Sequence, residues 1–159
     1  MNVAARLERD VFAQPKVRAA ILLIGINDIS WPGTAFAPNQ MRPIADEMIA
    51  GYQQIIALAK GNNIRLVGAT LPPFEGALTG TPLDDYYNRE KDALRQEINR
   101  WIRTGGAFDA VIDFDAVLRD PANQSRINPA FDSGDHLHPG DAGNRAMAEA
   151  VNLDELLGH

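Results

Sequence analysis

The feature that most limits how this chain can fold is a nearly uninterrupted apolar run, Val17–Gly25, close to its amino end. A strand with apolar side chains on both faces is buried on both faces, which is typical of a parallel sheet covered by helices. Two further runs, at residues 63–71 and 108–114, have the length and composition of strands. We therefore expect a parallel sheet that contains these three strands.

Segments with the periodicity of amphipathic helices separate the three runs. Apolar residues recur at helical spacing over residues 2–13, 43–60, 84–104 and 141–157. Glycine and proline indicate irregular loops over residues 26–41 and 72–82. This alternation predicts crossover units in an α/β fold, with helices on both faces of the sheet. The 159 residues show no linker or internal repeat, so we expect a single domain, residues 1–159.

Composition narrows the range of partners. The net charge is −6, and neither a basic cluster nor a basic helix face occurs, so we expect no nucleic acid and no membrane as partner. The amino end is a charged amphipathic segment rather than a secretory signal, which leaves a cytoplasmic location as the default expectation. Cysteine is absent, and His136 and His138 have no third ligand at a recognisable spacing. We expect neither a metal nor a cofactor.

The segment Phe131–Pro139 carries the first candidate for chemistry. Asp135 precedes His138 by three residues, in a stretch that Gly134 marks as irregular. A histidine acts as a general base only when a hydrogen bond to its other ring nitrogen fixes the tautomer, and Asp135 could supply that bond. The alternative is an ordinary solvated loop. A helix is expected to follow, with Asp141 as its N-cap.

The second candidate directly follows the first predicted strand, in the segment Gly25–Asp28. The side-chain amide of Asn27 could donate a hydrogen bond to an oxyanion, although Asn-Asp is also a common turn sequence. Because ligands of open α/β sheets bind beyond the carboxyl ends of the strands, we expect Asn27, Glu75 and His138 on one side. Glu75 either lines this pocket or is a solvated loop carboxylate. Asp28 is expected near the pocket, bracing its loop through backbone hydrogen bonds.

Other polar and aromatic residues have weaker signals. The aromatic residues near these loops are expected either to shape a pocket or to pack in the core; they are Trp31, Phe74, Tyr86 and Tyr87. The carboxylates of Asp113 and Asp115 end the third predicted strand, and we interpret them as caps.

Taken together, Gly25-Ile26-Asn27-Asp28 and Asp135-His136-Leu137-His138-Pro139 resemble the third and fifth sequence blocks of the SGNH/GDSL hydrolases, a family that acts on carboxylic esters. The resemblance extends over essentially the whole chain. It implies a flavodoxin-like three-layer α/β/α sandwich around a five-stranded parallel sheet. It also implies that Asn27 is an oxyanion donor, His138 the general base and Asp135 the residue that orients it.

Two blocks of the family have no counterpart in this sequence: the first, with the nucleophilic serine, and the second, with a glycine of the oxyanion hole. We therefore expect a sheet shortened at its amino end to about three of the five strands. Of the three serines, Ser30 and Ser133 lie near the two motifs. Either is a candidate replacement nucleophile, although each also suits a turn. Water activated by His138 is a third route.

The expected function is the hydrolysis of a small-molecule ester, weakly or with an unusual nucleophile. The alternatives are a catalytically inactive binding or assembly module, and a half-site that another chain completes. In the family's sheet the nucleophile strand lies beside the strand that is here Ala19–Ile24. Without it this strand is an open edge, which favours pairing with another chain. We expect a homo-oligomer formed through this edge, unless the first helix folds over the gap.

Overall fold

A parallel sheet with the strand order β1-β2-β3 forms the centre of the fold. The structure is a computed structural model that describes residues 3 and 5–158. Its elements are, in chain order, η1 (Glu8–Phe12), β1 (Ala19–Leu22), α1 (Ile26–Ser30), α2 (Ala45–Gly61), β2 (Arg65–Ala69), α3 (Arg89–Thr104), β3 (Ala110–Ile112), α4 (Phe114–Leu118), α5 (Asp141–Glu149) and α6 (Leu153–Leu157). The predicted α/β class and the parallel sheet of three strands are confirmed. The strands are shorter than the apolar runs that predicted them.

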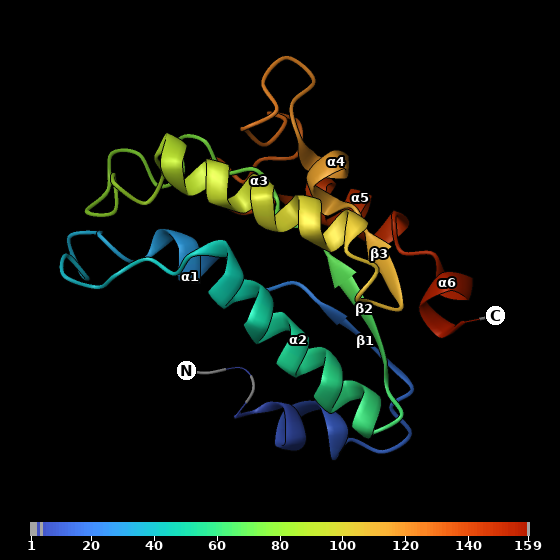
Figure 1. Cartoon of the computed structure of the whole chain (residues 1–159). Coiled ribbons are helices and arrows are strands. Elements are labelled where there is room, and N and C mark those ends of the chain that lie inside the picture. Colours follow the sequence, from blue (N-terminus) through green and yellow to red (C-terminus); the bar gives the residue numbers. More distant parts are fainter. Residues whose placement is uncertain (1–2, 4, 159) are drawn as a thin grey trace.

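The two faces of the sheet are buried by different helices, as Figure 1 shows for α2 and α3 in front and α5 behind. Along β2 the side chains alternate between the faces. Leu66 packs into the core shared with α2 and α3, whereas Val67 and Ala69 pack into a second core with Met147 and Leu156. This alternation explains why the strand is apolar from Leu66 to Ala69.

The two long helices bury the stripes that the sequence predicted. Met48, Tyr52 and Ile55 of α2 are buried, as are Ile98 and Ile102 of α3. No helix in residues 3 and 5–158 combines the length and the apolar character needed to cross a membrane.

The bounds of α3 differ from the prediction of residues 84–104. The helix begins at Arg89, because the side chain of Asn88 accepts a hydrogen bond from the Lys91 amide at 2.8 Å and caps its first turn. Residues 84 and 85 belong to a turn instead, and residues 86–88 are irregular.

Four local predictions were wrong, and side-chain caps explain two of them. The loop predicted from residue 26 begins with the short helix α1. The third strand ends at Ile112, where Asp113 caps α4 by accepting from the Ala116 amide. The last predicted helix is divided in two, because Asn152 caps α6. Gly140, not Asp141, is the N-cap of α5.

The amino-terminal helix was predicted over residues 2–13. The structure has the π-helix η1 at Glu8–Phe12, and residues 1, 2 and 4 of this region lie outside the described part of the chain. Leu7 is buried in the core shared with α2.

A buried ionic network holds the loop that leaves β2. Arg95 of α3 is 1% exposed and donates to Asp92 at 2.8 Å, to Asp115 at 2.5 Å and to the carbonyl of Leu71 at 2.9 Å. Asn99 bonds both the amide and the carbonyl of Leu71. Because buried charges are costly unless they are paired, this network fixes α3 relative to the carboxyl end of the sheet.

Candidate functional site

A closed loop carries the predicted Asp–His pair. Asp132 and Pro139 form an antiparallel bridge, and the Ser133 amide donates to the His138 carbonyl at 3.0 Å. Inside this loop the Nδ1 atom of His138 lies 2.6 Å from Oδ2 of Asp135. Since an ionised carboxylate only accepts hydrogen bonds, Nδ1 carries the hydrogen and Nε2 is left to accept a proton. The His138 side chain is 67% exposed.

The Asp135 carboxylate is held by more than the imidazole. Its Oδ1 atom accepts from the backbone amides of Leu137 at 2.9 Å and His138 at 2.8 Å, and from the Ser133 hydroxyl at 3.0 Å. Partial burial opposes ionisation, but these bonds and that of the His138 ring hold the pKa of Asp135 well below its usual range. The carboxylate is therefore ionised at neutral pH and fixes the ring.

A second Asp–His pair in the same loop was not predicted. Nδ1 of His136 is hydrogen bonded to Asp132, whose other oxygen accepts from the amides of His136 and Gly134, both at 3.0 Å. His136 has a φ of 60° and its ring lies against Gly76. The carboxylate of Asp132 thus closes the left-handed turn that presents Asp135. The available signal was the four-residue spacing of Asp132 and His136.

Helix α5 anchors both ends of this loop. A Cβ atom at Gly143 would lie 2.6 Å from the Phe131 carbonyl oxygen and 2.8 Å from Cβ of Pro139, so only glycine permits the observed approach. The side-chain amide of Asn144 donates to the Pro139 carbonyl at 3.2 Å. The first turn of α5 therefore determines where the imidazole of His138 is held.

Asn27 lies in α1, just beyond the carboxyl end of β1, and is exposed. The hydroxyl of Tyr86 donates to its Oδ1 atom at 2.5 Å. Burial, together with the negative charge of Asp28, raises the pKa of Tyr86 to about 12, so this hydroxyl keeps its proton. With Oδ1 engaged, the orientation of the amide is fixed and Nδ2 remains as a donor.

A small apolar cluster joins the two motifs. Phe74, Ala77 and Tyr86 are buried together, and Ile26 and Leu137 pack against them. Ile26 precedes Asn27 and Leu137 precedes His138, so the two motifs meet at the loop that follows β2.

A backbone hydrogen bond links the same loops directly. The amide of Leu78, in the loop after β2, donates to the Asp135 carbonyl at 2.9 Å. Figure 1 shows that the segments after β1 and β2 leave the sheet at the same edge.

The two candidate pocket carboxylates differ in their surroundings. Glu75 accepts from Asn123 at 2.9 Å and from the Tyr87 hydroxyl at 3.3 Å, so it ties two loops together. Asp28 is exposed and lines a cavity of about 500 Å3. That Asp28 braces its loop through backbone hydrogen bonds stays a prediction.

Neither candidate serine hydroxyl is hydrogen bonded to the imidazole of His138. The Ser30 side chain is fully buried in α1, and its hydroxyl has no hydrogen-bond partner within the described part of the chain. The Ser133 hydroxyl donates instead to Asp135. Neither hydroxyl is therefore placed to donate its proton to Nε2 of His138 in this structure.

The aromatic residues divide between core and surface. Phe74 and Tyr86 are buried, whereas Trp31 stacks on Phe36 at the surface with ring centroids 5.9 Å apart. Over the residues that the structure describes, no three His, Cys, Asp or Glu side chains are grouped as metal ligands would be.

Comparisons with known proteins identify the family and the fold. The family model of GDSL-like lipases and acylhydrolases matches residues 1–151. A GDSL-like lipase from Bacteroides thetaiotaomicron has a similar structure, with a TM-score of 0.70 and 15% identity over 96% of this chain and 68% of the lipase. An acetylxylan esterase from Geobacillus stearothermophilus has a TM-score of 0.61 and 22% identity over 99% of this chain and 66% of the esterase. Comparison with curated protein sequences gave no match.

Proposed function

This chain belongs to the GDSL-like lipase/acylhydrolase family, and we propose that it hydrolyses carboxylic esters, with His138 as the general base, Asp135 as its orienting carboxylate and Asn27 as an oxyanion donor. The observation that carries the proposal is the 2.6 Å contact between Asp135 and Nδ1 of His138. It leaves Nε2 of an exposed imidazole as the proton acceptor. The names of the lipase and the acetylxylan esterase with similar folds also point to ester bonds.

The reaction begins when Nε2 of His138 takes a proton from a nucleophile bound beside it. Asp135 stabilises the imidazolium that forms and keeps the ring in the tautomer that can accept. The nucleophile attacks the carbonyl carbon of the ester, and the carbonyl oxygen becomes an oxyanion. When the tetrahedral intermediate collapses, the bond to the alcohol oxygen breaks and His138 returns the proton to that oxygen.

The oxyanion is stabilised by the side-chain amide of Asn27. Its Nδ2 donor is preorganised, since the Tyr86 hydroxyl already occupies Oδ1 at 2.5 Å. A donor that is fixed before the reaction needs no reorganisation when the negative charge develops.

Water is the nucleophile that best fits the described part of the chain. Ser30 is buried, and the hydroxyl of Ser133 is committed to the Asp135 carboxylate. A water molecule on the open face of His138 needs no rearrangement of either serine. Such a reaction forms no acyl-enzyme, so the release of the first product shows no burst.

The test is the steady-state hydrolysis of p-nitrophenyl acetate by the whole chain. His138→Ala should lower kcat/KM by about 10²-fold or more, the usual contribution of a general base. His136→Ala, which removes an imidazole from the same loop, is the matched control and should retain most of the activity. Equal rates for wild type and His138→Ala would overturn the proposal.

The nucleophile is tested separately. If water attacks, a serine-directed phosphonate should leave both Ser30 and Ser133 unlabelled by mass spectrometry, and Ser133→Ala should remain active. Labelling of either serine would replace water with that hydroxyl.

A second candidate function is ligand binding without turnover. The observation that favours it is that the hydroxyl of neither Ser30 nor Ser133 is hydrogen bonded to the imidazole of His138. Hydrolysis and binding without turnover can be told apart by adding an ester or its analogue to the whole chain. A binding module would show no hydrolysis above the buffer rate, while an ester analogue would still shift the amide resonances of Asn27 and His138.

A further inference from the structure

A cavity between α3 and α4 has a lining that the proposed ester hydrolysis does not use. Its volume is about 250 Å3, enough for several water molecules. Asn27, Asp135 and His138 do not line it. Its lining instead includes one acidic residue and four arginines, which are Asp115, Arg95, Arg100, Arg103 and Arg119.

Arg95 keeps hydrogen-bond donors for this cavity, although it is only 1% exposed. Its Nε atom donates to Asp92, and its Nη1 atom donates to Asp115 and to the Leu71 carbonyl. Over residues 3 and 5–158, Nη2 donates to no other group of the protein. A guanidinium has five N–H donors, and buried donors are nearly always paired. The two N–H groups of Nη2 are therefore left for an occupant of the cavity.

The other three arginines of the lining also have donors to spare. Arg103 uses Nε and Nη2 on Asp113 and Asp115, and its Nη1 atom has no partner within the part of the chain that the structure describes. Arg119 lies 3.8 Å from Asp115, which is beyond hydrogen-bond distance. Arg100 is exposed, and its side chain has no hydrogen bond or ion pair to any described residue.

The arginines around this cavity outnumber the carboxylates that contact them. Ion pairs connect the four side chains to three carboxylates, those of Asp92, Asp113 and Asp115. Because arginine stays protonated in proteins, the cluster has one positive charge in excess, in a chain whose net charge is −6. Along α3 the arginines are interspersed with acidic residues, so the cluster forms only when the chain folds.

We propose that this cavity binds a phosphoryl group, either as free phosphate or as part of a small phosphate monoester. Guanidinium groups match the oxygens of phosphate and carboxylate in geometry and charge. The spare donors here belong to four side chains from α3 and the end of α4. A tetrahedral anion has acceptors in four directions, whereas those of a carboxylate lie in one plane, so phosphate engages more of these donors. The site is independent of the proposed function, since it contains none of the proposed catalytic residues.

Calorimetric titration of the whole chain with inorganic phosphate provides the first test. The titration is made at constant ionic strength and at a pH above the second phosphate pKa of about 6, where the anion is divalent. We expect saturable binding of one phosphate per chain. Succinate, a dianion without a tetrahedral group, should bind at least tenfold more weakly. The absence of saturable phosphate binding, or equal binding of succinate, would overturn the proposal.

A second titration identifies the source of the phosphoryl group. Glycerol 3-phosphate carries the same anion on a small polar alcohol. If it binds more tightly than inorganic phosphate, the site takes a monoester, and if it binds more weakly, the site takes the free anion. Either order supports the site, because both probes must be lost together in the variants below.

Variants then test the arginines themselves. Arg100→Gln and Arg119→Gln each remove one guanidinium that has no hydrogen bond in the described part of the chain, so circular dichroism should show an intact fold. Each should raise the dissociation constant of phosphate by about tenfold, as the loss of a charge-assisted hydrogen bond does. The double variant should bind neither phosphate nor glycerol 3-phosphate measurably.

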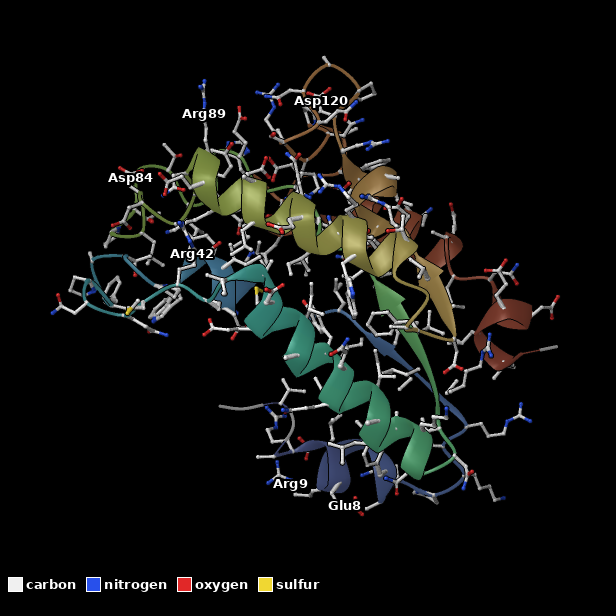
Figure 2. All side chains as sticks on the ribbon, viewed as in Figure 1. Glu8, Arg9, Arg42, Asp84, Arg89 and Asp120 are labelled. Atoms are coloured by element: carbon white, nitrogen blue, oxygen red, sulfur yellow. The ribbon has the colours of Figure 1, made fainter. Side chains whose placement is uncertain are left out.

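The matched control is Arg89→Gln. Arg89 projects from the first turn of α3, as Figure 2 shows, whereas Arg100 and Arg103 lie near its carboxyl end. This variant changes the net charge by the same amount and should leave the dissociation constant unchanged. If Arg119→Gln fails to fold, Arg100→Gln and Arg89→Gln still decide the outcome. Equal losses of affinity in these two variants would show that phosphate responds only to net charge, and would refute the site.

Discussion

The hydroxyl of Tyr86 donates a hydrogen bond of 2.5 Å to Oδ1 of Asn27, 59 residues earlier in the chain. Tyr86 is 2% exposed and Asn27 is exposed, so the bond connects the interior to the candidate site. Without it, the amide group of Asn27 could rotate and present either its oxygen or its nitrogen to a substrate. The bond therefore decides which end of the amide faces the oxyanion.

Tyr86→Phe should lower kcat for ester hydrolysis by about tenfold with little change in KM, because the orienting bond acts on a group used in the transition state. Asn27→Ala should cost about 10²- to 10³-fold, as the loss of an oxyanion donor does. In the double variant the loss should not exceed that of Asn27→Ala alone. Tyr87→Phe, which removes a neighbouring hydroxyl, is the control. Additive losses would show that Tyr86 acts by another route.

Asp135→Asn should reduce kcat by about 10²- to 10⁴-fold, because an amide at this position can donate to Nδ1 and stabilise the wrong tautomer of His138. The measurement is kcat and KM for p-nitrophenyl acetate. Asp141→Asn, a substitution of the same kind at an exposed position in α5, should change neither value. Unaltered kcat in Asp135→Asn would mean that the carboxylate does not orient the base.

Arg95→Met should lower the free energy of unfolding by about 3–5 kcal/mol, since it leaves the carboxylates of Asp92 and Asp115 without their buried partner. The measurement is urea denaturation followed by circular dichroism at neutral pH. Arg100→Met on the same helix is exposed and should stay within about 0.5 kcal/mol of wild type. Equal effects of the two substitutions would show that the network contributes little to stability.

Stability should fall at alkaline pH, partly because of Tyr86. The pKa of this tyrosine is raised to about 12 by burial and by Asp28, so its neutral form is favoured in the folded state. The corresponding stability is complete below the ordinary tyrosine pKa of about 10 and is lost as the pH rises from there towards 12.

Urea titrations over this alkaline range should therefore give a shallower decline for Tyr86→Phe than for wild type. Tyr52 is buried and its pKa is also raised, so part of the decline should remain in the variant. A curve for Tyr86→Phe parallel to that of wild type would contradict the assignment.

The sequence predicted those parts of the fold that follow from hydrophobic periodicity. The apolar run at Val17–Gly25 predicted β1, and the helical spacing of apolar residues over 84–104 predicted the helix that buries Ile98 and Ile102. Periodicity could not show where capping side chains end an element. Asp113 was interpreted as a cap, and it caps a helix that the prediction lacked.

Other features depend on contacts that only the folded chain reveals. Arg95 is a charged residue in a polar stretch of α3, and its burial is possible only because Asp92, Asp115 and the Leu71 carbonyl converge on it. In the candidate site, the pairing of Asp135 with His138 could be predicted from their spacing, because both residues lie in one turn. The hydrogen bond between Tyr86 and Asn27 could not be predicted, since it connects two separate loops.

The close packing of Gly143 against Phe131 and Pro139 lets helix α5 control the position of His138, although α5 itself contributes no proposed catalytic residue. Any displacement of helix α5 should also displace the His138 loop, because the backbone at Gly143 packs directly against the loop with no side chain between them. Gentle heating that frays the carboxyl-terminal helices should then abolish the proposed ester hydrolysis while the sheet is still intact. Activity would then be lost at a lower temperature than the one at which the sheet unfolds. The difference between the two temperatures would measure how independently α5 and the His138 loop unfold.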